Sequence, residues 1–208
     1  KPMIYYPIER LVSAGITDII IVTGKENAGD FMNLLGSGKE FGAKFHYVLQ
    51  DEAGGIAHAL SLVEGFVNED SMTVILGDNI ILDDISEHVS NFNSGAKIFL
   101  KEVKDPQRFG VPEFDETKKI KRIEEKPKEP KSNYAVTGIY QYDNTVFDKI
   151  RRLKPSARGE LEITDVNNMY LEEGRLSYAF LKEPWLDAGT FESLLEASNI
   201  LRERSSKN

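Results

Sequence analysis

Apolar residues in the first half of the chain follow two alternating spacings. Four of them recur at helical spacing before a stop at Gly15 and predict an amphipathic opening helix, namely Ile4, Ile8, Leu11 and Val12. The run at 18–23 is uninterrupted and rich in β-branched residues, which is typical of a strand covered by helices on both faces. Similar elements follow, with strands expected at 45–49 and 72–76 and helices at 30–35, 56–66 and 85–92. This βα repetition predicts an α/β fold, a Rossmann-like, doubly wound and mostly parallel sheet flanked by helices.

The second half has a different pattern, because polar loops that contain proline separate its strand candidates. Strands are expected at 97–103, 120–124, 135–142 and 176–181, with a short piece at 185–186, and helices at 146–153, at 163–172 and from 191 to about 204. We therefore expect a smaller antiparallel portion or a lid here. At 208 residues the chain fits one domain, 1–208, with halves at about 1–95 and 96–208.

The composition excludes several classes of protein. A net charge of −8, from 26 basic and 34 acidic side chains, repels a polyanionic backbone, so we expect no nucleic-acid partner. No apolar run approaches the roughly 18 residues of a membrane helix, so we expect no membrane partner. Without cysteine there is no disulfide, thiolate metal site or cysteine nucleophile. Because nothing at the start resembles a secretory signal, we expect a cytoplasmic protein.

Two common phosphate-binding motifs are missing. The Gly-Lys pairs at 24–25 and 38–39 are each followed by Glu and lack a glycine five residues earlier, which excludes a P-loop. The glycines of 36–38 are not followed by the third glycine of a dinucleotide-binding turn. The histidines have no paired spacing, and surface or packing roles are expected for them: His46, His58 and His88.

Acidic residues after two strands are the strongest chemical signal. Asp78 and Asn79 follow one apolar strand, and Asp187 follows another and stands close to Gly189. Strand ends face the ligand crevice of a doubly wound sheet, and magnesium takes one or two protein carboxylates together with water and phosphate oxygens. The two aspartates together therefore predict a phosphate-handling magnesium site. Taken separately, an Asx turn at Asp78 and a helix cap at Thr190 explain the motifs as well.

Other charged residues lie between these aspartates in the sequence. Glu125 offers a carboxylate that can accept hydrogen bonds from hydroxyl groups, and Lys126 offers an ammonium for phosphate. Arg158 is a second candidate cation. Taken singly, each is also explained as solvated surface charge.

Several segments, read in order, carry a resemblance that spans essentially the whole chain. They are Lys1-Pro2-Met3-Ile4-Tyr5-Tyr6-Pro7, Leu76-Gly77-Asp78-Asn79-Ile80, Arg108-Phe109-Gly110-Val111, Glu124-Glu125-Lys126-Pro127, Lys131-Ser132-Asn133-Tyr134-Ala135-Val136-Thr137-Gly138, the block at 153–165, and Trp185-Leu186-Asp187-Ala188-Gly189-Thr190. Together they resemble the sugar-1-phosphate nucleotidyltransferases, most closely the members that join a thymidylyl group to glucose 1-phosphate.

The resemblance implies transfer of a nucleoside monophosphate from dTTP to glucose 1-phosphate, with release of pyrophosphate. A member that uses UTP instead is the nearest alternative. In-line attack by the sugar phosphate on the α-phosphorus needs positioning and charge neutralisation rather than a covalent protein nucleophile. The resemblance also implies a homo-oligomer, a nucleotide-binding first half and a sugar-binding second half.

Residue roles are carried over by matching position. The resemblance implies that Asp78 and Asp187 bind Mg²⁺ and that Lys126 and Arg158 contact phosphate on the sugar-phosphate side, with Asp78, Asp187 and Lys126 as the catalytic set. It implies that the sugar is held by Asn79, Gly110, Glu125 and Val136. It further implies that Gln50 and Gly55 meet the pyrimidine base.

The chain departs from the family at three places. Family members begin with a strand and a glycine-rich loop that carries an arginine, followed by a lysine; none of these precedes Lys1, so we expect further residues upstream and a cleft in the core where the strand belongs. Gly54 stands where longer members carry an aspartate, which affects the base and ribose contacts. The chain stops after the helix that begins at 191, so feedback through a second nucleotide site is not expected.

The missing cationic loop leaves a function of a different class open. A non-catalytic module would hold a sugar nucleotide without transferring it.

Overall fold

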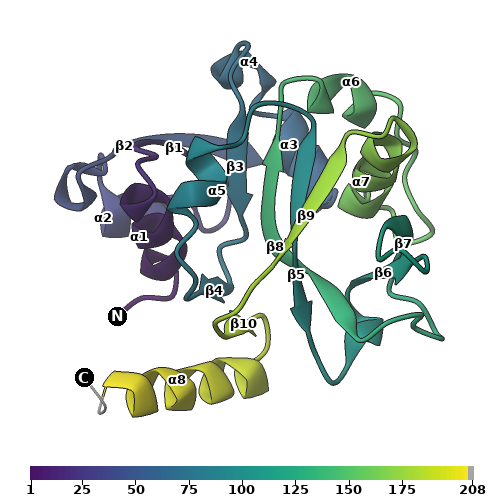
Figure 1. Ribbon diagram of the computed structural model, residues 1–208. Helices are drawn as coiled ribbons and strands as arrows, with labels where there is room; N and C mark the ends of the chain where they lie inside the picture. The colour runs from purple at the N-terminus through teal and green to yellow at the C-terminus, as the bar shows by residue number, and fades with distance from the viewer. Residues whose placement is uncertain (206–208) are drawn as a thin grey trace.

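The structure is a computed structural model that describes residues 1–205, in which helices pack around a central sheet (Figure 1). The helices are α1 (Tyr5–Ser13), α2 (Ala28–Leu35), α3 (Ile56–Ser61), α4 (Glu64–Val67), α5 (Ser86–Ser90), α6 (Val146–Ile150), α7 (Ile163–Glu172) and α8 (Phe191–Ser205), with short 3-10 helices at Lys39–Phe41 and Pro106–Arg108. The strands are β1 (Asp18–Gly24), β2 (Lys44–Gln50), β3 (Met72–Ile75), β4 (Asn79–Ile81), β5 (Ala96–Glu102), β6 (Gly110–Phe114), β7 (Ile120–Glu125), β8 (Tyr134–Tyr142), β9 (Leu176–Phe180) and β10 (Trp185–Asp187).

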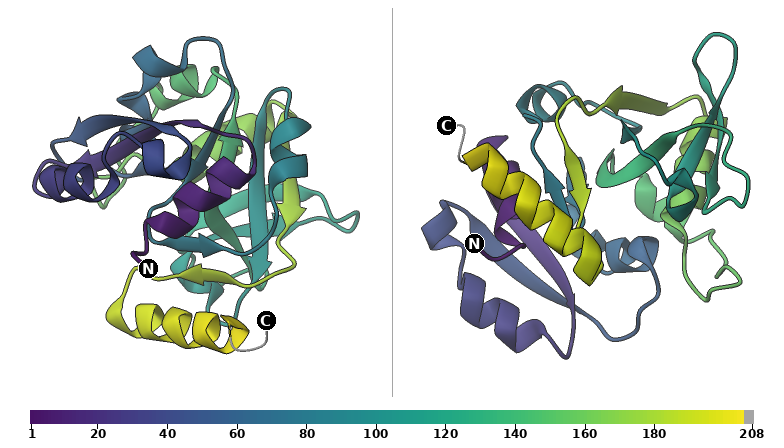
Figure 2. Two further views of the ribbon diagram at one scale, coloured as in Figure 1. Left: turned by 90° about the vertical axis from the view of Figure 1, so that its left-hand side faces the viewer. Right: turned by 90° about the horizontal axis from the view of Figure 1, so that it is seen from below.

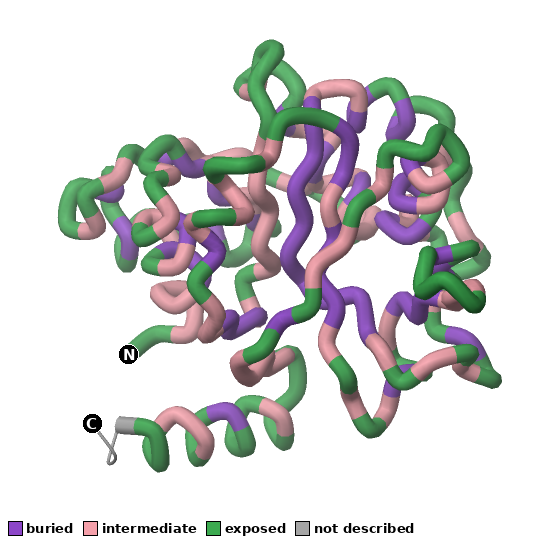
Figure 3. Tube along the Cα trace, in the orientation of Figure 1, coloured by how far each residue is buried: buried purple, intermediate pink, exposed green. Residues whose placement is uncertain are grey.

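Strand β8 is the centre of the largest sheet. The strand order is β7-β6-β8-β5-β9, and β3 also pairs with β8. Almost every residue of β8 is buried, and the strand forms part of the buried middle of the molecule in Figure 3. Tyr142 stacks on Tyr140 and on Tyr170 of α7, at ring-centroid distances of 6.0 and 5.9 Å. The sequence of β8 is almost wholly apolar or aromatic because helices and other strands cover it on both faces.

Two short ladders stand beside this sheet. β1 and β2 pair in parallel, starting with Asp18 opposite Lys44. β4 and β10 pair antiparallel, which puts Asp187 opposite Asn79. The second ladder therefore joins two segments that lie more than a hundred positions apart in the sequence.

The predicted α/β class, with helices flanking the sheet, is confirmed, and the sheet itself is mixed. Parallel pairing occurs in β1–β2 and β5–β9, whereas β3–β8, β5–β8, β6–β7, β6–β8 and β4–β10 are antiparallel. An apolar run shows that a strand is buried on both faces, but it does not report the direction of its neighbours. The antiparallel pairing of β3 with β8 was therefore not predictable from the run at 72–76.

Three elements differ from their predicted form. The helix expected at 56–66 is divided into α3 and α4, and Asn79 opens strand β4 instead of belonging to a simple turn. β6 occupies a region expected to be a loop because it contains Pro112, which lacks an N–H for a sheet. The structure tolerates this proline because no N–H of Pro112 is needed for pairing with β8, which β6 meets only where Gly110 lies opposite Val136.

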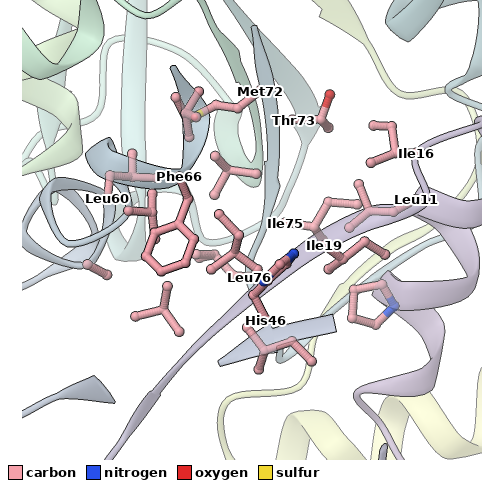
Figure 4. Close-up of a pocket in the computed structure, with 18 of the residues that line it drawn as sticks. Leu11, Ile16, Ile19, His46, Leu60, Phe66, Met72, Thr73, Ile75 and Leu76 are labelled. Atoms are coloured by element: carbon pink, nitrogen blue, oxygen red, sulfur yellow. The ribbon is translucent and has the colours of Figure 1, made fainter. Parts of the chain in front are cut away.

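An apolar cavity of about 1000 Å³ lies between β1 and β3 (Figure 4). Residues 18–22 of β1 and 72–77 in and after β3 line it, together with Leu11 of α1, Leu60 of α3 and Phe66 of α4. Within residues 1–205, β1 pairs only with β2 and β3 only with β8, so each has one unpaired edge. The cleft that the sequence predicts in the core is therefore present.

The last helix, α8, runs along one side of the molecule, below β4 and β10 in Figure 1 and past the N-terminus in Figure 2. Its Ala197 is buried in a small apolar cluster with Ile80 and Ala188, to which Met3 and Tyr6 add contacts. Phe191, at the start of the helix, is 90% exposed. None of the helices in residues 1–205 is long and apolar enough to cross a membrane.

Candidate active site

A second cavity, of about 630 Å³, lies where β4, β6, β7, β8 and β10 approach the start of α7. Most of the predicted site residues line it: Asp78, Asn79, Gly110, Glu125, Lys126, Val136, Arg158 and Asp187. These residues come from segments that are far apart in the sequence, so the sheet brings the predicted set together.

Two carboxylates meet beside Gly189. The β4–β10 ladder sets the backbones of Asp78 and Asp187 side by side, and the Ala188 N–H donates to the carbonyl of Asp78 at 2.9 Å. A Cβ placed on Gly189 would lie 3.0 Å from Asp78 Oδ2 and 3.2 Å from Asp187 Oδ1. Both oxygens therefore face one small space that only a glycine leaves free.

The charges in this space are close enough to affect each other. Burial and the nearby charge of Asp78 raise the pKa of Asp187 above its ordinary value, and the hydrogen bond from the Gly189 N–H opposes this rise. Two like charges at one point favour a bound cation.

The donor set at this point fits Mg²⁺. Among residues 1–205 no group of three or more His, Cys, Asp and Glu side chains is arranged to hold a metal ion. Magnesium does not need such a group when phosphate oxygens and water complete its octahedron, because one or two carboxylates are then sufficient. Asp78 and Asp187 supply that number at the space beside Gly189.

Asn79 fixes the orientation of Asp78. The Asn79 side chain is 2% exposed, and its Nδ2 donates to Asp78 Oδ1 at 2.8 Å. Its Oδ1 accepts from the Gly138 N–H at 3.1 Å and from Trp185 Nε1 at 2.5 Å. A Cβ on Gly138 would lie 2.4 Å from Asn79 Oδ1, so this arrangement requires glycine there. Asn79 thus links β4, β8 and β10 at the site.

Arg108 is a site residue that the sequence reasoning did not assign. Its Nη2 lies 3.8 Å from Asp187 Oδ2, and its Nη1 donates to Asp105 Oδ2 at 2.9 Å. The hydrogen bond with Asp105 and the charge of Asp187 raise the pKa of Arg108. Its place in the Arg108-Phe109-Gly110-Val111 segment was the available signal, but only the fold brings this segment to Asp187.

Glu125 is held by a hydroxyl from α7. Thr164 Oγ1 donates to Glu125 Oε2 at 2.5 Å, and Arg158 Nη2 lies 3.5 Å from Glu125 Oε1. A Cβ on Gly110 would lie 3.1 Å from Thr164 Oγ1 and 3.4 Å from Glu125 Oε2. Thr164 lies inside the resembling block at 153–165, but nothing in the sequence marked it as a partner of Glu125.

The two predicted phosphate contacts differ in their present partners. Arg158 Nη2 lies 2.7 Å from Glu162 and 3.5 Å from both Glu160 and Glu125, and the hydrogen bond to Glu162 raises the pKa of Arg158. Lys126 is exposed, and its φ of 45° is rare for a residue with a side chain. The fold holds that backbone in place, since the Lys126 N–H donates to the Phe109 carbonyl at 2.9 Å.

Gln50 and Gly55 lie apart from the other predicted residues, on the wall of the larger apolar cavity. The two cavities adjoin at three residues that line both: Ile56, Leu76 and Glu160. Gln50 Nε2 is 3.0 Å from His58 Nδ1, and a Cβ on Gly54 would lie 2.3 Å from the same nitrogen. Gly54 therefore makes room for His58, whose contact with Gln50 the sequence did not reveal.

A mixed sheet with two carboxylates at one point and cationic side chains around the same cavity defines a class of phosphate-handling transferase. The chain belongs to the nucleotidyl transferase family, whose sequence pattern matches residues 1–204.

Individual relatives show which members of the family are similar to this chain. The chain is 46% identical to the glucose-1-phosphate thymidylyltransferase of Neisseria meningitidis, over 97% of this chain and 72% of that protein. It is 44% identical to the enzyme of that name from Mycobacterium tuberculosis, with the same coverage.

Solved structures agree in fold. A Bacillus anthracis protein assigned as a glucose-1-phosphate thymidylyltransferase, crystallised with a sucrose, matches with a TM-score of 0.91 and 57% identity, over 97% of this chain and 82% of that one. UDP-glucose pyrophosphorylase in complex with UDP-glucose matches with a TM-score of 0.83 and 25% identity, over 98% of this chain and 88% of that one.

Proposed function

We propose that the protein transfers the thymidylyl group of dTTP to glucose 1-phosphate, forming dTDP-glucose and pyrophosphate. The convergence of Asp78 and Asp187 beside Gly189 carries this proposal, because it provides for a metal ion at the point where phosphate charge must be neutralised. The 44–46% identity to glucose-1-phosphate thymidylyltransferases supports the choice of these substrates.

Glucose 1-phosphate binds in the 630 Å³ cavity in this proposal. Lys126 and Arg158 contact its phosphate, and Arg158 exchanges part of its pairing with Glu162, Glu160 and Glu125 for the phosphate oxygens. Glu125, oriented by Thr164, accepts hydrogen bonds from the sugar hydroxyls.

The other predicted sugar contacts complete the pocket. Gly110 and Val136 form its floor and let the ring approach the backbone, and they lie opposite each other in the sheet. Asn79 adds the remaining N–H of its amide while it keeps Asp78 in place.

Mg²⁺, held by Asp78 and Asp187, supplies charge neutralisation for the phosphate oxygens when bound. Asn79 orients Asp78, and Arg108 offers a cation next to Asp187. The sugar phosphate attacks the α-phosphorus in line, so the residues of the chain position the two substrates and form no covalent intermediate.

The nucleoside binds on the side of the larger cavity, where Gln50 and Gly55 meet the base. Residues 1–95 thus act as the nucleotide-binding half and 96–208 as the sugar-binding half of one domain. We also propose that the protein works in the cytoplasm and that it forms a homo-oligomer. Light scattering of the purified protein tests the oligomeric state.

The decisive experiment supplies Mg²⁺, glucose 1-phosphate and either dTTP or UTP, and follows pyrophosphate release. A preference for dTTP is expected. The fold similarity to UDP-glucose pyrophosphorylase makes a uridylyltransferase the second candidate, and a preference for UTP would establish it. Binding of dTDP-glucose in a calorimetric titration, without product from either nucleotide, would replace both with a non-catalytic binding module.

A further inference from the structure

The segment just before β10 is held by two charged side chains. Lys101 Nζ, from β5, donates to the carbonyl oxygens of Leu181, Lys182 and Glu183 at 3.1, 3.0 and 2.9 Å. The carboxylate of Asp83 accepts the N–H groups of Lys182 and Glu183, each at 2.9 Å. Hydrogen bonds to ionised groups are shorter and stronger than neutral ones. Lys101 and Asp83 therefore form a clamp on this segment.

The clamp and the two aspartates lie at opposite ends of the β4–β10 ladder. Asp78 directly precedes β4 and Asp187 ends β10, whereas Asp83 follows β4 and Glu183 precedes β10. A strand rises about 3.3 Å per residue, so the clamp holds the backbone about 13 Å from Asp187.

The ladder between them is short. Only Asn79–Ile81 pairs with Trp185–Asp187, as a two-stranded sheet of its own. Two-stranded ladders are marginally stable by themselves, so the register of β10 against β4 depends on what fixes each end. At the Asp187 end the Ala188 N–H donates to the Asp78 carbonyl, and the Trp185 side chain binds Asn79 across the ladder. At the other end the clamp acts together with the Leu181 N–H, which donates to the Leu100 carbonyl.

We propose that Lys101 and Asp83 are positioning residues that keep the Asp187 carboxylate beside that of Asp78 at the metal site. This proposal rests on the function proposed above, because the position of Asp187 matters only if the metal site takes part in that function. Neither side chain touches the metal or the substrates; both act through the backbone of β10. Loosening the clamp lets β10 shift along β4, and a shift of about 1 Å separates the two carboxylates from their common point.

Three substitutions test the clamp, and a fourth serves as a matched control. Lys101→Met keeps the aliphatic stem but removes the three donors, and Asp83→Asn keeps the shape but replaces one acceptor oxygen with a donor that faces an N–H. Lys101→Arg retains a positive charge and several N–H donors, so it should keep the contact with the three carbonyl groups. Lys97→Met removes a lysine from the same strand, β5, that is not part of the clamp.

The experiment measures Mn²⁺ binding to each protein by water-proton relaxation, with the Mg²⁺ dependence of turnover alongside. Lys101→Met and Asp83→Asn should each weaken Mn²⁺ binding and raise the half-saturating Mg²⁺ concentration about 10-fold, the lower end of the effect of residues that orient metal ligands. The KM for glucose 1-phosphate should stay within about twofold. Lys101→Arg and Lys97→Met should bind Mn²⁺ as the unchanged protein does.

Unchanged Mn²⁺ affinity in Lys101→Met and Asp83→Asn overturns the proposal, even if their melting temperatures fall, because the clamp would then be a purely structural anchor. A similar loss in Lys97→Met overturns it as well. If the unchanged protein binds Mn²⁺ but releases no pyrophosphate, the proposed function fails while the binding comparison still decides the role of the clamp.

Discussion

The two cavities of this protein are built in opposite ways. The cavity between β1 and β3 is lined mainly by apolar side chains, and in the part of the chain that the structure describes each of these strands is paired along one edge only. The cavity around Asp78 and Asp187 is lined by charged and polar groups tied to one another, such as Asn79 to Asp78 and Thr164 to Glu125. The two cavities adjoin at the three residues that line both, Ile56, Leu76 and Glu160.

This difference separates two tasks. Polar side chains of the second cavity are already oriented by hydrogen bonds, so ligands meet fixed groups there and little ordering is required when they bind. The larger cavity offers apolar surface and strand edges, which accept other backbone or a flat apolar ring rather than a set of charges. We therefore expect the reaction to take place in the second cavity, and substitutions in the two cavities to impair the protein in different ways.

The largest effect is expected at the paired carboxylates. Asp78→Asn and Asp187→Asn should each lower turnover at least about 100-fold, because each removes a charge from the metal site where the transition state is stabilised. Steady-state pyrophosphate release measures this. Asp84→Asn is the matched control, since Asp84 is exposed and its hydrogen bonds within residues 1–205 go to Ser86, and it should keep its rate within about twofold. A near-normal rate in either variant of the pair would remove that aspartate from the metal site.

A sugar-specific effect is expected at Glu125. Glu125→Gln keeps the shape and an acceptor for Thr164 but removes the charge. The KM for glucose 1-phosphate should rise about 10-fold, because hydrogen bonds to ionised groups are the stronger ones, while the KM for dTTP should change little. Equal losses for both substrates would show that the second cavity does not separate sugar from nucleotide.

Whether the sequence predicts a feature of this protein depends on how far apart in the chain the interacting residues lie. Asp78 and Asp187 were predictable as a pair, because each comes at the end of an apolar run and ligands bind beyond strand ends in an α/β sheet. The antiparallel β4–β10 ladder that brings them together was not predictable from those runs. The contact of Arg108 with Asp187 was not predictable either, because it depends on how the turn before β6 packs against β10.

The fold shows the same limit. The apolar run of β1 and the amphipathic α1 follow from local patterns, and both elements are found where expected. Burial alternates along β1, because its second face borders the larger cavity. The antiparallel pairing of β3 with β8 and the acceptance of Pro112 in β6 are set by partners that are distant in the sequence. Local patterns carry no record of such partners, so these features became visible only in three dimensions.

Hydrogen exchange tests the contrast in strand pairing directly. Over Tyr140–Tyr142, β8 is paired with β3 along one edge and with β5 along the other, so consecutive amides there should all exchange slowly. Among the described residues β1 is paired with β2 alone, so slow exchange of the amides directed at β2 and fast exchange of the others should alternate with a period of two residues, by at least about 10-fold. Mass spectrometry with single-residue fragmentation resolves the pattern. Uniformly slow exchange along β1 would show that both of its edges are covered in solution.

The smallest effect is expected at Gly54, which lies between Ala53 and Gly55 on the wall of the larger cavity. In Gly54→Ala the new Cβ would meet the ring of His58, so His58 must leave Gln50. The KM for dTTP should rise about threefold, the loss expected from one modest hydrogen bond, and the KM for glucose 1-phosphate should stay constant. In a His58→Ala background the obstacle is gone, so adding Gly54→Ala should change nothing further. An equal rise in both backgrounds would mean that Gly54 acts on the nucleotide without His58, and the apolar cavity would then contact the base through its backbone alone.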